Sequence, residues 1–331
     1  MNLLVLGGGH FAGRAAVETA VARGHSVTVF NRGKTTLAVA PGVEWIRGDR
    51  DSDLGRLEGR TWDGVIDMCA FYPRHVESLL KTLKGRIGHY IFVSSVSAYA
   101  DMDEPGRDET SPLAQPISGA PETFAAETYG PFKAMCEASA LQWGPASTLM
   151  VRPGILVGPN DPTGRFSYWV QRVAAGGEIL APGNPEAPLQ VIDGRDLGEW
   201  MVEKAETVTT GSFNIVGPES PLTFREMLET AAAALNVRPQ FTWADDEFLI
   251  GKKAADWSQL PLYLPPTSPR GREIFRVSGK AAFANGLKVR PLAETIADNA
   301  RWLEGPHSSG AKKIGLSRER ESELLAQWHA R

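Results

Sequence analysis

The chain has 331 residues, 42% of them hydrophobic and 22% charged, and its formal net charge is −4. This composition is typical of a globular protein of one large or two modest domains and excludes a disordered chain. The negative charge argues against nucleic-acid binding driven by bulk basicity, which requires clustered Lys and Arg. Two cysteines, Cys69 and Cys136, exclude a disulfide framework, and the six histidines show no metal-ligand spacing. With no recognisable signal segment and no apolar run long enough to span a bilayer, we expect a cytoplasmic protein.

A glycine-rich turn lies near the start of the chain and reads Gly7-Gly8-Gly9-His10-Phe11-Ala12-Gly13. A predicted strand at residues 3–6 precedes it and a predicted helix at 12–23 follows it. A second apolar run at 26–30 closes a βαβ unit. In such a unit the glycines let the backbone approach a pyrophosphate, and the helix N-terminus donates N–H groups to it. The turn therefore predicts a dinucleotide site, with an ordinary tight turn as the alternative.

Strands and helices then alternate through the first half of the chain. Apolar runs predict strands at 43–46, 64–68, 90–95 and 149–152, and amphipathic stretches predict helices at 73–82 and 130–143. Almost fully apolar strands that alternate with helices are typical of α/β folds with a doubly wound parallel (Rossmann) sheet.

The second half is richer in Pro, Gly and Trp, which favours a smaller, loop-rich substrate domain over the carboxyl ends of the sheet. A strand at 213–216 returns to the sheet, and a helix at 222–235 begins at Thr223 with Glu226 as its capping partner. We expect the dinucleotide-binding domain at 1–160 plus about 190–218, the substrate-binding domain at 161–189 plus 219–304, and a linker with a C-terminal helix at 305–331. That helix, capped by Ser317, either packs on its own domain or contacts a second subunit in a homodimer.

Tyr129 and Lys133 are four residues apart and therefore share a face of the predicted helix. A lysine beside a phenol lowers the tyrosine pKa and prepares it for acid/base chemistry. The pair follows a strand that ends in Ser94-Ser95 and lies downstream of the glycine turn. Elsewhere the same spacing is commonly an ordinary amphipathic pair.

Together with Gly48-Asp49-Arg50-Asp51, the run Phe92 to Tyr99, Arg152-Pro153-Gly154 and Asp193 to Leu197, these motifs are similar to those of a known family. Over most of residues 2–303 the chain resembles the extended short-chain dehydrogenases/reductases, often labelled NAD-dependent epimerase/dehydratase. The resemblance implies that Tyr129 is the general acid/base and that Lys133 holds the cofactor ribose. It also implies that Ser95 binds the reacting oxygen, with Ser94 and Ser97 as alternatives.

The resemblance further implies a set of cofactor contacts. Asp49 and Arg50 are expected beside the adenine, Ala70 in the cofactor channel, and Pro153 and Gly154 against the nicotinamide. The full expected set is Gly7, Gly9, His10, Phe11, Ala12, Gly13, Asn31, Arg32, Lys34, Asp49, Arg50, Cys69, Ala70, Ser94, Lys133, Pro153, Gly154 and Ile155.

Two departures from the family pattern concern the cofactor. His10 replaces the middle glycine of the turn, and the second strand ends in Asn31-Arg32-Gly33-Lys34 rather than in an acid. Both features resemble a subgroup that contains the chloroplast stem-loop RNA-binding proteins. An acid at this position binds the ribose 2′-hydroxyl of NAD, whereas arginine suits a 2′-phosphate. We predict a preference for NADP(H), with NAD(H) and solvated loop charges as the alternatives.

A third departure concerns the substrate. Leu189 stands where nucleotide-sugar epimerases of this class present an arginine to the diphosphate, although Arg165, Arg172, Arg270 or Arg272 could replace it. Ser97 is a candidate substrate contact. Aromatic residues could line a pocket for a less charged carbonyl compound or pack in a domain core: Phe71, Tyr72, Phe166, Tyr168 and Trp169.

The sequence therefore predicts an NADPH-dependent reductase that acts on a carbonyl or secondary-alcohol carbon of a small molecule. Nucleic acid and membrane are not expected as partners. One alternative is a nucleotide-sugar 4-epimerase or dehydratase with tightly held NAD(P). Another, of a different class, is a non-catalytic family member that binds RNA or protein.

Overall fold

The computed structural model describes residues 1–34, 41–117, 119, 125–265, 267–268, 272–305 and 314–331. Six strands from the first half and one from the second form a seven-stranded sheet in the order β11-β6-β5-β4-β1-β2-β3, with every neighbouring pair parallel. The strands are β1 (Asn2–Leu6), β2 (Ser26–Asn31), β3 (Glu44–Arg47), β4 (Trp62–Asp67), β5 (Ile87–Val93), β6 (Thr148–Pro153) and β11 (Gly211–Ile215). The predicted doubly wound Rossmann sheet is confirmed.

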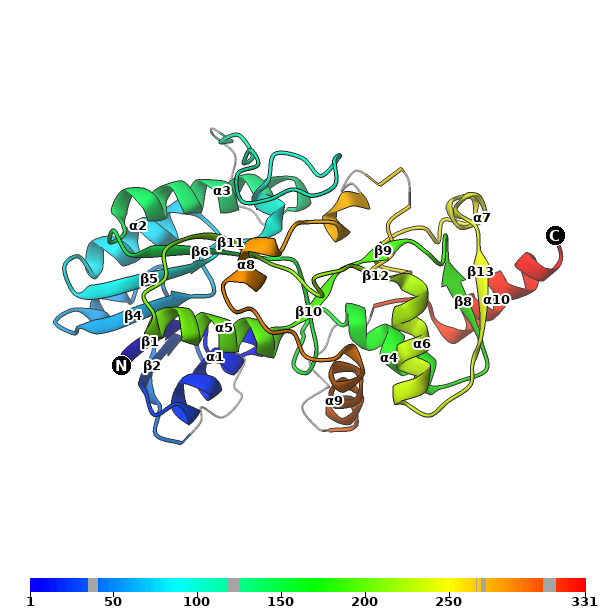
Figure 1. Ribbon diagram of the computed structural model, residues 1–331, viewed down its shortest axis with the longest axis horizontal. Helices are drawn as coiled ribbons and strands as arrows, with labels where there is room; N and C mark the ends of the chain where they lie inside the picture. The colour runs from blue at the N-terminus through cyan, green and yellow to red at the C-terminus, as the bar shows by residue number, and fades with distance from the viewer. Residues whose placement is uncertain (35–40, 118, 120–124, 266, 269–271, 306–313) are drawn as a thin grey trace.

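Helices cover both faces of this sheet, which explains why its strands are almost fully apolar. One layer holds α1 (Phe11–Ala22) and α5 (Gly194–Glu206), and the other holds α2 (Pro73–Thr82) and α3 (Ala126–Trp143) (Figure 1). Along β1, Leu3 and Val5 join the core under α1 and α5, whereas Leu4 and Leu6 join the core under α2. This alternation is the two-residue period of a strand.

The second half builds its own hydrophobic core beside the carboxyl ends of the sheet, at the right of Figure 1. A parallel pair, β8 (Glu178–Pro182) and β13 (Gln240–Ala244), packs there with helices. The helices are α4 (Arg165–Ala174), α6 (Phe224–Ala234), α7 (Asp246–Gly251), α9 (Leu292–Glu304) and α10 (Arg318–His329). Short strands link the two halves: β7 (Ile155–Val157) with β10 (Val191–Asp193), and β9 (Pro188–Leu189) with β12 (Leu222–Thr223). The remaining short helices are η1 (Leu54–Leu57), η2 (Val96–Ala98), η3 (Arg272–Phe275) and α8 (Lys280–Ala284).

The two cores divide the chain somewhat differently from the predicted ranges. Ala282 and Leu287 are buried with the core under α1 and α5, although they fall within the range 219–304 assigned to the substrate domain. The C-terminal helix α10 packs on the second core through Leu324 and Leu325, so it lies on its own domain. Within the described residues, no helix is both long and apolar enough to cross a membrane.

Local signals predicted several helix ends well. The helix at 73–82 matches α2 to the residue, whereas α3 begins at Ala126, a turn before the predicted residue 130. The capping box at the start of α6 is confirmed: Thr223 Oγ1 accepts from Glu226 N at 3.0 Å, and Glu226 Oε2 accepts from Thr223 N at 2.6 Å. Of the predicted linker, residues 306–313 lie outside the described part.

Candidate active site and cofactor site

The strand order places the candidate site where β1 and β4 lie side by side but continue in opposite directions across the sheet. Ligands of such folds bind at this switch point, beyond the carboxyl ends of the strands. Gly7 follows β1 and Cys69 follows β4. A Cβ built on Gly7 would lie 3.2 Å from Cys69 Cβ, so the glycine turn packs directly against the loop after β4.

The glycine turn is held tightly against α1. Gly7 has φ +84°, a left-handed conformation that favours glycine. A Cβ on Gly13 would lie 2.6 Å from Gly7 O, so only glycine allows α1 to pack on the turn. His10 is the N-cap of α1, and burial together with the Arg14 charge lowers the pKa of His10 below its ordinary value. The N-terminus of α1 presents backbone amide donors of the kind that bind anions.

Phe11 and Ala12 complete the start of this helix. Phe11 has φ +46°, which is strained for a residue with a side chain. Its ring lies against Gly194, where a built Cβ would be 2.9 Å from the Phe11 ring. Ala12 is buried in the core under α1 and α5. The start of α1 is therefore packed against the start of α5.

Charged side chains gather at the ends of β2 and β3. Arg32 and Lys34 are exposed, and Arg32 Nη1 lies 4.0 Å from Asp49 Oδ2. Arg47 Nε donates to Arg32 O at 3.2 Å. Asn31 Oδ1 accepts hydrogen bonds from the N–H groups of two nearby residues. The structure thus adds Arg47 to the two cations that the sequence singled out.

Arg50 forms a buried ion pair with Asp67 that the sequence did not predict. Its Nη1 and Nη2 each donate to an oxygen of Asp67 at 2.9 Å, and Nη2 also donates to His75 O. Tyr90 Oη and Cys69 N donate to the same carboxylate at 3.1 and 3.2 Å. Burial raises the pKa of Asp67, but the Arg50 charge and the hydrogen bonds from Arg50, Cys69 and Tyr90 together lower that pKa overall. The guanidinium thus holds the loop after β4, and its expected position beside the adenine stays a prediction.

That loop reaches the predicted catalytic pair on α3. Lys133 Nζ donates to Ala70 O and to Val93 O, both at 2.8 Å, and its side chain is buried. It lies 5.9 Å from the centre of the Tyr129 ring. Gly130 explains the close approach of α3, because a Cβ there would lie 2.1 Å from Ser97 O. The predicted shared face of Tyr129 and Lys133 is thus placed at the ends of β4 and β5.

The three serines after β5 have different environments. Ser95 is the N-cap of η2, and its Oγ accepts from Ser97 N at 3.1 Å, which leaves its hydroxyl proton for another acceptor. Ser94 Oγ is buried and has no hydrogen-bond partner within the described chain. Ser97 itself is half-buried. A bound group that meets the Ser94 hydroxyl would satisfy it.

Behind the site, the Arg152-Pro153-Gly154 motif begins a buried polar network that spacing alone did not reveal. Arg152 pairs with Glu137 at 2.7 Å and donates to Tyr99 Oη at 3.1 Å. Tyr99 Oη donates in turn to Asn214 Oδ1 at 2.7 Å. After Arg152, Pro153 ends β6, Gly154 follows it and Ile155 begins β7. These three residues lie at the same edge of the sheet as the serines.

The aromatic candidates for a substrate pocket separate into two groups. Phe71 is 38% exposed, and its ring centre lies 6.4 Å from that of Tyr129. Tyr72 packs edge-on against Phe132 at 5.2 Å. By contrast, Phe166 and Trp169 are each 1% exposed within the second core, and Trp169 Nε1 donates to Pro261 O at 2.6 Å. These two are core residues, as the alternative interpretation predicted, and not exposed lining of a substrate pocket.

The candidate replacements for a diphosphate-binding arginine are mostly committed elsewhere. Leu189 is fully buried in β9, and the buried Arg172 pairs with Glu321 of α10 at 2.6 Å. Arg165 Nε donates to Thr163 Oγ1 at 2.9 Å. Arg270 and the side chain of Arg272 lie outside the described part of the chain.

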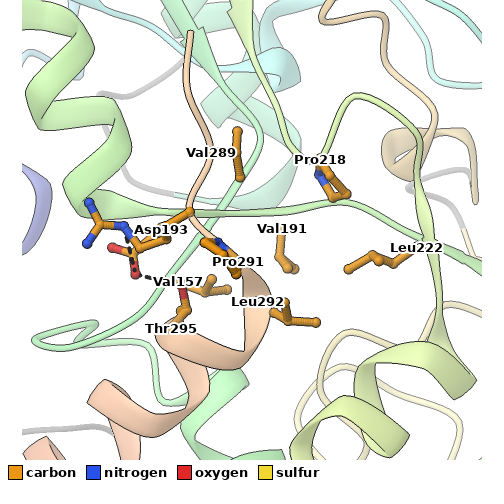
Figure 2. A pocket seen from close by; sticks show the side chains of 10 residues that line it. Val157, Val191, Asp193, Pro218, Leu222, Val289, Pro291, Leu292 and Thr295 are labelled. Carbon is orange, nitrogen blue, oxygen red and sulfur yellow. Dashed lines mark hydrogen bonds and ion pairs between the residues drawn. The ribbon is translucent and has the colours of Figure 1, made fainter. Parts of the chain in front are cut away.

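A pocket of about 260 Å³ lies between β7, β10 and the start of α9 (Figure 2). Its lining is mainly apolar, and its two charged residues, Asp193 and Arg290, lie 3.9 Å apart. Asp193 accepts from Arg195 N and from Thr295 Oγ1, so it caps α5 and ties α9 to it. Neither Ser95, Tyr129 nor Lys133 lines this pocket. Nowhere in the described ranges do His, Cys, Asp and Glu cluster as a metal site would need.

Comparison with known proteins agrees with this architecture. The protein is similar to the solved structures of UDP-glucose 4-epimerase from Thermus thermophilus (19% identity, TM-score 0.64) and UDP-N-acetylglucosamine 4-epimerase from Bacillus cereus (16%, 0.68). Each comparison covers 92% of this chain and 100% of the other. At these identities the similarity establishes the fold alone.

Sequence comparison shows similarity to one relative and to one family model. The chain is 26% identical, over 77% of its length and 69% of the relative, to the chloroplast stem-loop binding protein of 41 kDa b from Arabidopsis thaliana. Residues 74–216, which contain Ser95, Tyr129 and Lys133, match the model of the NAD dependent epimerase/dehydratase family. Over residues 74–216 the chain is therefore similar to the NAD dependent epimerase/dehydratase family.

Proposed function

We propose that this protein transfers a hydride between a nicotinamide cofactor and a carbonyl or secondary-alcohol carbon, with Tyr129 as the proton donor or acceptor. One observation carries the proposal. The buried Lys133 ammonium is fixed by Ala70 O and Val93 O at 2.8 Å and lies 5.9 Å from the Tyr129 ring. Ser95 lies at the end of the neighbouring strand with its hydroxyl proton available.

The residues present suit a nicotinamide dinucleotide. The α1 N-terminus presents amide donors for a pyrophosphate. Two of the three Lys133 protons are used by main-chain carbonyls, which leaves one for a ribose hydroxyl. Ser94 Oγ, at the same strand end, is buried and has no hydrogen-bond partner among the residues that the structure describes. The bound cofactor would supply or accept the hydride.

Residues of the chain itself transfer the proton. In the reductive direction the carbonyl carbon gains the hydride and its oxygen takes the proton of Tyr129 Oη, which gives an alcohol. The Lys133 charge stabilises the phenolate that remains. Ser95 Oγ donates to the substrate oxygen and holds it in place. Oxidation is the same step in reverse.

We propose NADP(H) as the preferred cofactor. Arg32, Lys34 and Arg47 surround the end of β2, where an acid would be needed to bind the ribose hydroxyls of NAD(H). Such a cluster suits a 2′-phosphate, because charge-assisted bonds to phosphate are the strong ones. Calorimetric titration with NADPH and NADH tests this, and tighter binding of NADH would contradict it.

For the substrate we propose a carbonyl compound without a diphosphate. Leu189 is buried where a cation would be needed, and Arg172 is paired with Glu321. The alternative reaction is epimerisation through a transient ketone, with the cofactor retained. A screen of carbonyl compounds and nucleotide sugars that follows NADPH absorbance separates the two, since epimerisation gives no net change in absorbance.

The substitution Tyr129→Phe tests the proposed chemistry. It removes the transferable proton and keeps the ring, so turnover should fall by about 10²–10⁴-fold. The affinity for NADPH, measured by calorimetry, should not change. Tyr263→Phe is the control, because Tyr263 packs in the second core and its hydroxyl bonds Asp246. Full turnover by Tyr129→Phe would show that another group moves the proton.

RNA binding is a second candidate, favoured by the similarity to a stem-loop binding protein. The net charge of −4 weighs against it, because RNA affinity depends on clustered cations. A gel-shift assay with a stem-loop RNA in moderate salt tests this directly. We expect no shift, and tight, salt-sensitive binding would favour the RNA-binding function.

A further inference from the structure

We infer that Trp45 determines cofactor specificity by fixing the side chain of Asn31 so that it offers the cofactor ribose only a hydrogen-bond donor. This inference rests on the proposed NADP(H) preference and gives a structural cause for it, the hydrogen bond from Trp45 to Asn31. Asn31 is the last residue of β2, and Trp45 lies on the neighbouring β3. Trp45 is not among the residues that the sequence motifs single out.

The hydrogen bonds leave one orientation for the Asn31 amide. Asn31 Oδ1 accepts from Gly33 N at 2.9 Å and from Trp45 Nε1 at 3.1 Å. A backbone N–H and an indole N–H are donors only, so the atom that faces both must be the amide oxygen. Both lone pairs of that oxygen are then used. The remaining polar atom of the side chain is Nδ2, which can only donate.

The surrounding backbone keeps this arrangement in place. Gly33 has φ +68°, and a Cβ built on it would lie 2.7 Å from Trp45 Cζ2, so the indole packs directly on the turn. Strand pairing places Asn31 opposite Arg47, and Gly48 N donates to Asn31 O at 2.9 Å. Trp45 pairs with Val29 in the same register, so the sheet holds its backbone. An amide flip would bring the Asn31 NH₂ group against two other donors.

With the amide locked, Asn31, Arg32, Lys34 and Arg47 offer only donors, and the carboxylate at this corner, Asp49, lies 4.0 Å from the Arg32 guanidinium. Arg32, Lys34 and Arg47 are cations without acceptors, and Arg47 is oriented by its bond to Arg32 O at 3.2 Å. A 2′-phosphate offers only acceptors and matches this set. The ribose hydroxyls of NAD(H) are best bound by an acceptor such as a carboxylate. Asn31 Oδ1 cannot serve as that acceptor, because it already accepts from Gly33 N and Trp45 Nε1. Trp45 therefore lowers the affinity for NAD(H), because its indole N–H occupies the Asn31 oxygen that a ribose hydroxyl would need.

The test measures binding of adenosine 2′,5′-bisphosphate and adenosine 5′-monophosphate by calorimetry and takes the ratio of their affinities. Trp45→Phe keeps a ring on Gly33 and removes the indole N–H. We expect the ratio to fall about fivefold, as the loss of one neutral hydrogen bond would give. Trp143→Phe is the matched control, since Trp45 and Trp143 are both 40% exposed, and its ratio should equal that of the wild type.

Asn31→Asp is the second variant. The carboxylate still accepts from Gly33 and Trp45, so the turn is kept, but Nδ2 is replaced by an anionic oxygen. We expect the ratio to fall tenfold or more, chiefly through weaker bisphosphate binding, on the order of one lost charge-assisted bond. Melting curves confirm that both variants fold.

The outcomes separate this inference from the proposed function. Equal affinity of the wild type for both nucleotides would contradict the NADP(H) preference itself, and this inference with it. A wild-type preference that survives Trp45→Phe unchanged would overturn the lock and leave the preference standing. A preference that survives Asn31→Asp would show that Asn31 takes no part in it. A fall in both variants, with none in Trp143→Phe, supports the inference.

Discussion

The substitution Asp67→Asn should strongly destabilise the protein, because it leaves Arg50 as a buried charge without a counter-ion. Asp67 is fully buried and accepts two bonds from Arg50, one from Tyr90 and one from Cys69 N. The Arg50 side chain is only 9% exposed. Breaking such a pair from one side costs about 3–5 kcal/mol. That is a large share of the ~5–15 kcal/mol that stabilises a typical protein.

Urea unfolding at pH 7 measures this cost. The control is Glu186→Gln, because Glu186 pairs with Arg225 at 2.9 Å but the two side chains are 62% and 41% exposed. Exposed pairs contribute about 0–1 kcal/mol. A double variant with Arg50→Met should lose less stability than the two single variants added together, because no unpaired charge remains.

The dependence on pH gives a second readout. The pKa of Asp67 is lower in the folded protein than its ordinary value of about 4. The carboxylate therefore contributes its full stability above that ordinary value and loses it as the pH falls through the lower folded value. The stability difference between wild type and Asp67→Asn should be constant from about pH 5 to 8 and shrink below about pH 4. A cost for Asp67→Asn no larger than that of the control, or a difference that grows in acid, would refute the reasoning.

Two further substitutions test the packing around the site and the C-terminal helix. Gly130→Ala places a Cβ 2.1 Å from Ser97 O and should push α3 away from η2, so we expect both turnover and melting temperature to fall. The control is Gly251→Ala, whose Cβ would meet open space. Unchanged turnover and melting temperature in Gly130→Ala would contradict the close approach of α3 to Ser97. Glu321→Gln leaves Arg172 unpaired in the second core and should expose α10 to trypsin, so cleavage at the wild-type rate would show that the pair does not hold the helix.

The elements that the sequence predicted well are those whose signals are local. Apolar runs identified the seven strands of the sheet, and the Thr223 capping box identified the start of α6. The predicted Tyr129 and Lys133 face follows from helix geometry alone, and the structure has both residues on α3. Their meeting with β4 and β5 needed only the strand order of a Rossmann sheet.

The polar networks could not be predicted in the same way. Arg50 and Asp67 lie 17 residues apart on different elements, and the chain holds 35 basic and 39 acidic residues from which such a pair might form. No spacing rule selects a partner across a tertiary contact. The aromatic side chains raise the same difficulty, since Phe71 lies beside Tyr129 and Trp169 lies in the second core, and residue type alone does not separate the two environments.

The structure, unlike the sequence, shows which atom of the Asn31 amide is available to the cofactor. Read from the sequence, it favours NADP(H) only because an acid is missing, and an amide is ambiguous because it carries both a donor and an acceptor. Its two bonds to Gly33 N and Trp45 Nε1 remove the ambiguity, since they use the acceptor and leave the donor. The same residue type without an indole beside it could turn its oxygen to a ribose hydroxyl. A family member with Asn at this position but no donor on the neighbouring strand should therefore distinguish the two cofactors less sharply.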